Sequence, residues 1–305
     1  MNKLLLIDTF NFLHRAYHAL PTSFRDERGE PTNAVYGVTS MVINILDQIK
    51  PTYVLAAMDS IEPTFRLEDF TAYKAHRKPM EEDLSSQIPK VIEMLDAFGI
   101  KQVMVNGYEA DDIIATTVAN YKDDNEIVVV SNDRDLWQLV DKNVLIMLPS
   151  TKGSAEWLGP KEVTSRFGFE PGKIADYKGL RGDTSDNIPG VFGIGEKTAA
   201  SLVKEFGSVE DIYNNIDKVK PDSLRQKLLN SYEQAMMSKK LAQLIYDVPI
   251  AVELDDLRYS TFNKINVKKV LERYNFKSLI RRLGFENENN KTSKSEVSKD
   301  QLSLL

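Results

Sequence analysis

The 305-residue sequence contains no cysteine, which excludes disulfide bonds, thiol catalysis and thiolate zinc sites. The absence of cysteine is also typical of a protein in a reducing compartment. Histidine is nearly absent as well, since only His14, His18 and His76 occur, so we do not expect a histidine-rich metal centre. Any metal ion must therefore be held by oxygen, which favours Mg²⁺, with Mn²⁺ as a substitute.

Long apolar runs are also missing. No run reaches the roughly 20 residues that a membrane-spanning helix needs, so we expect no membrane contact. The N-terminal run Leu4–Ile7 stops at Asp8. Because a signal-peptide core needs about seven apolar residues or more, this run is predicted to be a buried strand instead. The net charge of −6 argues only weakly against nucleic-acid binding, because acids and bases can gather in different places.

Apolar segments alternate with helical patterns over the first half of the chain. Strands are predicted at 3–8, 53–58, 102–105, 126–131 and 144–148, with helices at 33–48 and 87–98. This alternation predicts an α/β fold, a mostly parallel central sheet with helices on both faces. From about residue 160 the pattern is mainly helical, with helices expected at 197–206, 222–245 and 266–282.

Carboxylates follow four successive predicted strands. Ligands of open α/β sheets bind at the edge where the strands end, so these acids should converge there. One aspartate after a strand is an ordinary turn residue, but four such strands in succession are not expected by chance. With two more aspartates in a later polar turn, the candidates are Asp8, Asp59, Glu109, Asp111, Asp112, Asp133, Asp135, Asp183 and Asp186.

The stretch 107–112 has two interpretations when it is read alone. Its acids precede an apolar helical run, and acids in a first helical turn simply complement the helix dipole. Alternatively, they point toward metal. If all the candidate carboxylates converge, bound cations must offset their repulsion. Two divalent ions about 3.5–4 Å apart would suit in-line displacement at phosphorus.

Six motifs occur in a fixed order over roughly residues 1–285. They are Leu6–Asp8, Pro63–Arg66, Gly107–Asp112, Asp133–Leu136, Gly182–Gly190 and Gly193–Ala199. With these motifs the sequence closely resembles the 5′-nuclease family. That family includes the N-terminal 5′→3′ exonuclease domain of bacterial DNA polymerase I, phage 5′-exonucleases and flap endonucleases.

The resemblance implies a PIN-like 5′-nuclease fold in three parts. Residues 1–160 would form the catalytic α/β domain, with a helical arch at about 60–90. Residues 161–285 would form a helical DNA-binding region, with a helix-hairpin-helix variant at about 180–210. Residues 286–305 are polar and would form a disordered tail.

The resemblance also implies two sets of metal ligands. Asp8, Asp59, Glu109, Asp111 and Asp112 would serve the first Mg²⁺ ion. Asp133, Asp135, Asp183 and Asp186 would serve the second, partly through water. Two local departures are Thr9-Phe10, where the family usually has Gly-Asn, and Ser131-Asn132, where a glycine is more common before the aspartate.

Basic residues mark the expected path of DNA. Lys74 and Arg77 would share a helix face with Lys78, and this segment alone could equally be a solvated surface helix. By resemblance, Lys74 and Arg77 contact the scissile phosphate, as catalytic groups that stabilise its developing charge. Other DNA contacts are expected from Tyr73, which would stack on a base, and from Arg15 and Arg66, which would lie near the phosphate.

Gly193-Ile194-Gly195 opens a predicted helix and would by itself indicate only a simple turn. Following Asp183 and Asp186, it resembles the helix-hairpin-helix variant of the family. By resemblance, this element grips the duplex backbone, often with a K⁺ ion held by loop carbonyls. The DNA contacts would come from Gly193, Ile194, Gly195, Lys197 and Thr198.

The last five residues, Gln301, Leu302, Ser303, Leu304 and Leu305, resemble the bacterial sliding-clamp-binding pentapeptide, with Leu305 in place of Phe. The alternative is a nondescript tail. The sequence ends where DNA polymerase I continues into further domains, so we expect a stand-alone protein.

The expected function is that of a Mg²⁺-dependent, structure-specific 5′→3′ exonuclease and 5′-flap endonuclease. Its substrates would be DNA with 5′ flaps, nicks or 5′ ends, and RNA primers, during replication and repair. We expect a monomer in the bacterial cytoplasm, associated with the nucleoid. One alternative is a non-catalytic DNA-binding adaptor recruited to the clamp, which the complete set of carboxylates disfavours. Another is a PIN-like ribonuclease, which the arch and the Gly193–Gly195 element disfavour.

Overall fold

The computed structural model describes residues 1–149 and 155–285. The chain divides into two compact units. Unit 1 contains Met1–Asn11, Ile49–Pro79 and Gln102–Arg258, and unit 2 contains Phe12–Gln48, Met80–Lys101 and the chain from Tyr259 onward. The predicted domain limits stay a prediction. No helix within the described residues has both the length and the apolar character needed to cross a membrane.

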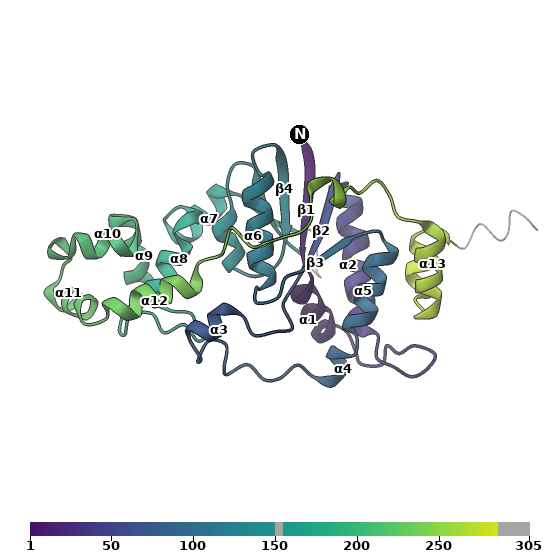
Figure 1. Ribbon diagram of the computed structural model, residues 1–305, viewed down its shortest axis with the longest axis horizontal. Coiled ribbons are helices and arrows are strands. Elements are labelled where there is room, and N and C mark those ends of the chain that lie inside the picture. The colour runs from purple at the N-terminus through teal and green to yellow at the C-terminus, as the bar shows by residue number, and fades with distance from the viewer. Residues whose placement is uncertain (150–154, 286–305) are drawn as a thin grey trace, which may run out of the picture. The chain divides into compact units, whose positions relative to one another are not determined.

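A sheet organises the first half of the chain (Figure 1). Within the described residues, six strands lie in the order β3-β2-β1-β4-β5-β6. Their bounds are β1 (Asn2–Asp8), β2 (Tyr53–Met58), β3 (Lys101–Met104), β4 (Asn125–Val130), β5 (Val144–Leu148) and β6 (Glu156–Leu158). β1 pairs in parallel with β2 and β4, and β4 with β5, whereas β6 is antiparallel to β5. The predicted mostly parallel sheet is therefore confirmed.

The position of β1 between β2 and β4 explains its apolar sequence. Leu4, Leu5 and Leu6 are completely buried because this central strand is covered on both faces. Parallel pairing also aligns the strand ends, since Asp8 lies opposite Ala57 of β2 and Ile7 lies opposite Val130 of β4. The residues that follow these strands therefore emerge at one edge of the sheet.

Helix α6 (Ala110–Tyr121) begins at this edge and packs on β1, β2 and β4. Its residues Ile113 and Ile114 are buried in the same core as Leu6 and Val129. Glu109 takes an extended conformation as the N-cap residue, so the predicted helix start is confirmed. Packing of α6 thus fixes where the acids of its first turn lie.

Unit 1 continues as a helical region, which confirms the predicted fold class. Its α-helices are α7 (Pro160–Phe167), α8 (Ile174–Arg181), α9 (Glu196–Phe206), α10 (Val209–Asn214), α11 (Asp222–Leu229) and α12 (Tyr232–Ala242). Four short 3₁₀ helices accompany them within the described residues: η1 (Asp135–Leu139), η2 (Pro171–Lys173), η3 (Ile216–Lys218) and η4 (Leu254–Leu257). The single helix expected at 222–245 is instead divided at Asn230–Ser231, because Ser231 leaves the helical conformation as the N-cap of α12.

A tight loop joins α8 to α9 and carries two of the candidate aspartates. Asp183 and Ile188 exchange two backbone hydrogen bonds of 2.8 Å. At the base of the loop Gly182 and Gly190 have φ values of 78° and 62°, and a Cβ atom on Gly190 would lie 2.1 Å from the Gly182 nitrogen. Only glycine fits at this point, where the two ends of the loop pass close to each other.

Unit 2 is helical. It contains most of α1 (Thr9–Ala19), α2 (Asn33–Ile49), α4 (Glu82–Ser85), α5 (Ile88–Ala97), α13 (Lys264–Arg273) and α14 (Lys277–Arg282). The buried amide of Gln87 accepts a hydrogen bond from the Ala34 nitrogen and donates one to Asn33, which joins the starts of α2 and α5. The single helix expected at 266–282 is wrong, because Asn275 takes a left-handed conformation with φ of 58° and separates α13 from α14.

Candidate metal centre

All nine predicted carboxylates belong to unit 1 and come from five places in its fold. Asp8 ends β1, and Asp59 follows β2. Glu109, Asp111 and Asp112 lie at the start of α6. The remaining four lie after β4 and in the loop after α8, namely Asp133, Asp135, Asp183 and Asp186. These acids divide into two groups by their contacts with lysine and arginine.

The first group has no ion pair. Within residues 1–149 and 155–285, no lysine or arginine nitrogen lies within 4.0 Å of Asp8, Asp59, Asp111 or Asp133. Asp8 is buried, with 5% of its surface exposed. Burial raises the pKa of Asp8 from 3.8 to about 7, aided by repulsion from Asp59 and Asp133, although hydrogen bonds oppose the shift.

The other three unpaired acids show the same trend. Burial, followed by repulsion from Asp133, Asp8 and Asp59, raises the pKa of Asp111 well above its usual value. Burial is also the main cause that raises the pKa of Asp59 and of Asp133. Because Asp59 and Asp133 repel Asp8, and all three repel Asp111, the structure does bring these side chains together.

Two hydrogen bonds orient Asp8, and one of them comes from Ser131, which belongs to a local departure in the sequence. The helix α1 starts directly after it, and the Asn11 amide donates a hydrogen bond of 3.1 Å to one carboxylate oxygen. The Ser131 hydroxyl donates a 2.7 Å bond to the other oxygen and accepts a bond from the Asp133 nitrogen. Ser131 therefore links two carboxylates that the sequence alone left separate.

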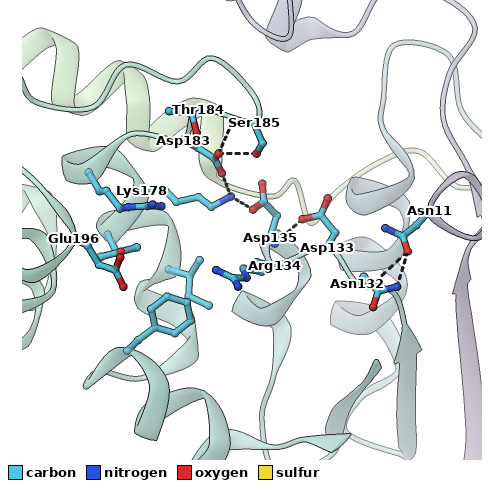
Figure 2. Close-up of a pocket in the computed structure, with 14 residues that line it drawn as sticks. Asn11, Asn132, Asp133, Arg134, Asp135, Lys178, Asp183, Thr184, Ser185 and Glu196 are labelled. Carbon is cyan, nitrogen blue, oxygen red and sulfur yellow. Dashed lines mark hydrogen bonds and ion pairs between the residues drawn. The ribbon is translucent and has the colours of Figure 1, made fainter. Parts of the chain in front are cut away.

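The second group is paired with cationic side chains. Lys178 on α8 contacts a carboxylate oxygen of Asp135 and lies 2.5 Å from one of Asp183 (Figure 2). Lys178 is buried; burial raises the pKa of Asp183, but this lysine and the hydrogen bonds from Ser185 together lower it by more. The pKa of Asp183 is therefore held below its usual value.

The basic residues at 73–77 form the next set of pairs. Lys74 Nζ lies 2.9 Å from Glu109, and Arg77 lies 2.5 Å from Asp186. Tyr73 is buried, and its hydroxyl donates to both Glu109 and Asp186. Burial, reinforced by these two carboxylates, raises the pKa of Tyr73. A buried ring cannot stack on a base in this conformation, so the structure does not support that part of the prediction.

The helix expected at 73–78 is also wrong. Residues 71–77 form consecutive turns between α3 (Phe65–Asp69) and Pro79. Lys74 has φ of 52°, and its amide donates a 2.9 Å hydrogen bond to the Asp186 carbonyl oxygen. An α-helix cannot continue through a left-handed residue. The predicted arch at about 60–90 stays a prediction.

Arg66 differs most from the expectation. It was predicted near a DNA phosphate, but only 2% of its surface is exposed. Its guanidinium makes two 2.7 Å hydrogen bonds to the completely buried Asp112. It also donates to the carbonyl oxygens of Leu241 and Gln243. In this structure Arg66 is thus a buried structural residue and is not accessible to DNA.

Asp112 is correspondingly a partner of protein groups. Besides Arg66, it accepts a 3.0 Å hydrogen bond from the Ile245 nitrogen. The pair therefore attaches α6 to the chain that leaves α12. Any metal role for Asp112 would require these bonds to break, so its direct ligation of metal stays a prediction.

The remaining predicted residues lie elsewhere. Gly193 and Ile194 precede α9, Gly195 is its N-cap, and Lys197 and Thr198 lie in its first turn. Their contact with DNA stays a prediction. Arg15 belongs to α1 within unit 2, and its phosphate contact also stays a prediction. The clamp peptide Gln301–Leu305 lies outside the described residues.

A cavity of about 450 Å³ adjoins the carboxylates. Figure 2 shows Asp133 and Asp135 on one side and Lys178 reaching toward Asp135 and Asp183. The cavity is also lined by Arg134, Arg181 and Tyr177. It combines acids suited to metal with cations suited to phosphate.

The carboxylate oxygens are suitable ligands for hard divalent ions, but they do not form a site in which protein side chains supply every ligand. Within the described chain, no group of three or more His, Cys, Asp or Glu side chains is arranged to hold a metal ion by itself. Mg²⁺ commonly binds through one or two carboxylates and keeps several waters. The four unpaired acids fit that mode, because burial raises their pKa values and none of them forms an ion pair within the described chain.

Sequence reasoning missed Ser131 and Lys178. Ser131 gave a signal as one of the local departures, two residues before Asp133, but it was given no role. Lys178 gave a weaker signal. It is a lone lysine in the helical segment 174–180, which is otherwise suited to burial, and its partner Asp135 lies 43 residues away.

The chain matches the family described as "5′-3′ exonuclease, N-terminal resolvase-like domain" over residues 3–168. It also matches "5′-3′ exonuclease, C-terminal SAM fold" over residues 169–265. It is 43% identical over 286 residues to DNA polymerase I of Caldicellulosiruptor bescii, covering 92% of this chain and 33% of the polymerase. For DNA polymerase I of Bacillus subtilis the identity is 42%, covering 92% and 32%. The chain thus spans about a third of the length of these relatives.

Solved structures share the fold. One is the T5 5′-exonuclease with bound divalent zinc ions, with a TM-score of 0.64 and 23% identity, covering 89% of this chain and 99% of that one. Another is the catalytic core of Rad2 with a DNA substrate, with a TM-score of 0.57 and 15% identity, covering 89% and 86%. At these identities the likeness concerns the fold.

The buried pair Arg66–Asp112 makes a prediction about stability. The substitution Arg66→Met should lower the free energy of unfolding by about 3–5 kcal/mol, because Asp112 would be left buried and unpaired. The double variant R66M/D112N should lose less than the sum of the two single variants. The measurement is urea unfolding. Arg258→Met is the control, since its pair with Asp255 is exposed and should contribute little to stability. A loss in R66M no larger than in R258M would contradict the assignment.

The raised pKa of Asp8 makes a prediction about pH. In EDTA, the folded protein should keep a proton on Asp8 up to about pH 7, while the unfolded chain loses it near 3.8. The wild type should therefore lose stability relative to Asp8→Asn as the pH rises through this window, by about 1–3 kcal/mol. Urea unfolding of both proteins at pH 4.5 and pH 8 measures the difference. If the difference between them does not depend on pH, Asp8 titrates normally.

Proposed function

The chain belongs to the 5′-3′ exonuclease family, and we propose that it is a structure-specific 5′-nuclease that requires Mg²⁺. Its substrates would be DNA with 5′ flaps, nicks or 5′ ends, together with RNA primers in replication and repair. The reaction would be attack of water on a phosphodiester, which leaves a 5′-phosphate on the product.

One observation carries this proposal. Four acids from separate parts of unit 1, Asp8, Asp59, Asp111 and Asp133, meet with raised pKa values and without a cationic partner among the described residues. A protein that served only as an adaptor would gain nothing from holding these acids together. Their repulsion is instead offset when divalent ions and substrate phosphates occupy the site.

Divalent ions, when bound, would activate the attacking water and stabilise charge on the attacking and leaving oxygens. The protein's own part is to hold the acids that bind them. Asp8 is oriented by Ser131 and Asn11, and Asp59 by a 2.8 Å hydrogen bond from the Ala110 nitrogen. Because these bonds fix the carboxylates before substrate arrives, little reorganisation is needed for catalysis.

Lys74 and Arg77 would move from carboxylates to phosphate. Both now pair with Glu109 and Asp186, and Arg77 is half-exposed, with 51% of its side chain accessible. A scissile phosphate next to Asp186 would compete for these cations. Once paired with phosphate, they would stabilise its developing negative charge.

The duplex would be gripped through its backbone at the start of α9. Gly193–Gly195 precedes this helix, and free amides at a helix start can bind phosphate. The likeness to Rad2 solved with a DNA substrate and to T5 5′-exonuclease solved with divalent ions supports both extensions. Binding of K⁺ at this element, a monomeric state, and clamp binding by Gln301–Leu305 remain parts of the same proposal.

Cleavage of a 5′-flap substrate tests this function. With Mg²⁺, the protein should release the flap and leave a 5′-phosphate, whereas EDTA should abolish cleavage. Asp111→Asn should lower turnover by about 100-fold or more while changing DNA affinity only a few-fold, because the acid would bind metal rather than DNA. The control is Asp141→Asn, which alters a partly exposed ion pair with Lys122.

The outcomes that count against the proposal are specific. Cleavage that persists in EDTA would exclude the metal requirement. Near-normal turnover of D111N would exclude the proposed role of Asp111 in metal binding. Products that lack a 5′-phosphate would exclude the proposed cleavage, which leaves the phosphate on the 5′ end of the product. Tight flap binding without any cleavage would favour the adaptor alternative.

A further inference from the structure

Lys178 occupies a particular place among the carboxylates. It lies on α8 and reaches between Asp135 of η1 and Asp183 of the loop after α8, two acids predicted to serve the second metal ion. Figure 2 shows its side chain between these two carboxylates, at the edge of the cavity. Its ammonium therefore supplies the positive charge that a divalent ion would otherwise bring.

The backbone that carries Lys178 is fixed by packing. The next residue, Gly179, lies so close to α12 that a Cβ atom would be 2.8 Å from the Lys239 Cβ. Helix α8 also packs on α9 and on η1. The ammonium can therefore leave Asp135 and Asp183 only by rotation of its own four-carbon side chain, and the cavity of about 450 Å³ provides space on that side.

Lys178 and a second divalent ion would compete for the same two carboxylates, those of Asp135 and Asp183. Asp135 and Asp183 carry two negative charges, and Lys178 neutralises one of them inside the protein. A divalent ion that binds the same two oxygens must approach a buried ammonium or expel it. Expulsion breaks a desolvated ion pair, which costs free energy unless the lysine finds another anion.

The cavity offers such an anion when DNA is present. Arg134 and Arg181 line it together with Lys178, and these cations would attract phosphate although Asp133, Asp135, Asp183 and Glu196 line it too. We propose that Lys178 is an internal counter-ion that keeps the second divalent ion weakly bound until a DNA phosphate takes its ammonium and frees Asp135 and Asp183. This inference rests on the proposed function and adds to it an order of binding.

The four unpaired acids provide the contrast within the same site. No lysine or arginine nitrogen among the described residues lies within 4.0 Å of Asp8, Asp59, Asp111 or Asp133, although Lys178 acts on Asp133 from a longer distance. The first ion should therefore bind without DNA. The second ion and the DNA should then strengthen each other's binding equally, because coupling between two ligands is reciprocal.

The experiment is a titration of the full chain with Mn²⁺. Electron paramagnetic resonance measures the concentration of Mn²⁺ that stays free in solution. Without DNA, the wild type should bind one ion at least about tenfold more tightly than a second. Lys178→Met keeps the length of the side chain but removes its charge, so the second ion should bind at least about tenfold more tightly than in the wild type. Lys178→Arg should resemble the wild type.

Lys239→Met is the matched control. Lys239 is also a half-buried lysine that bridges two acids, Asp176 and Glu210, but it does not line the cavity. Its removal should leave both Mn²⁺ affinities unchanged. A second arm of the experiment adds a flap DNA with a non-hydrolysable linkage. This DNA should raise the affinity of the wild type for the second Mn²⁺ ion, and should raise that of K178M only slightly.

The outcomes separate this inference from the proposed function. If neither wild type nor variants bind Mn²⁺, the metal-dependent function fails. If two ions bind the wild type with equal affinity, or K178M leaves the second affinity unchanged, only the role of Lys178 fails. If K178M does not fold, the DNA arm on the wild type decides, because a second-ion affinity that DNA does not change would overturn the inference.

Discussion

Repulsion among carboxylates at one edge of the sheet is the constraint on which unit 1 depends. Parallel strands deliver Asp8, Asp59 and Asp133 to that edge, and α6 adds Glu109 and Asp111. The fold answers this repulsion in two ways. Five of the nine acids pair with lysine or arginine, while four keep no such partner within the described chain and have raised pKa values. The unpaired acids are where external positive charge is needed.

The Gly107–Asp112 motif uses neighbouring acids for opposite purposes. Successive residues on an α-helix point about 100° apart. Asp111 therefore faces the other acids, whereas Asp112 faces inward to Arg66. The Arg66–Asp112 pair then binds the chain at 241–245, which follows α12. This buried pair therefore joins the start of α6, where the acids lie, to the segment after α12. Helix α12 in turn packs on α8, which precedes the loop with Asp183 and Asp186.

Local patterns in the sequence were enough to predict the parts of the site that depend on local structure. Strands β1 and β2 are buried apolar runs followed by an acid, so Asp8 and Asp59 could be placed at strand ends, and the acids at 109–112 at a helix start. The order of motifs supplied the family. Strand β6 was missed because three residues give too short a pattern.

What could not be predicted depends on contacts between distant residues. The sequence shows that Arg66 is basic, but not that its guanidinium faces Asp112, 46 residues away, rather than solvent. Lys74 lies in a segment with helical spacing, yet its amide is taken by the loop at Asp186, which imposes a left-handed turn. Lys178 acquires a role only because packing of α8 brings it between Asp135 and Asp183.

The central claim is that the unpaired acids form the first divalent-ion site. Anomalous diffraction from crystals grown with Mn²⁺ and without DNA tests it most directly. The account predicts that the strongest anomalous peak contacts carboxylate oxygens or bridging waters among Asp8, Asp59, Asp111 and Asp133. A strongest peak between Asp135 and Asp183, with none among the four unpaired acids, would contradict it.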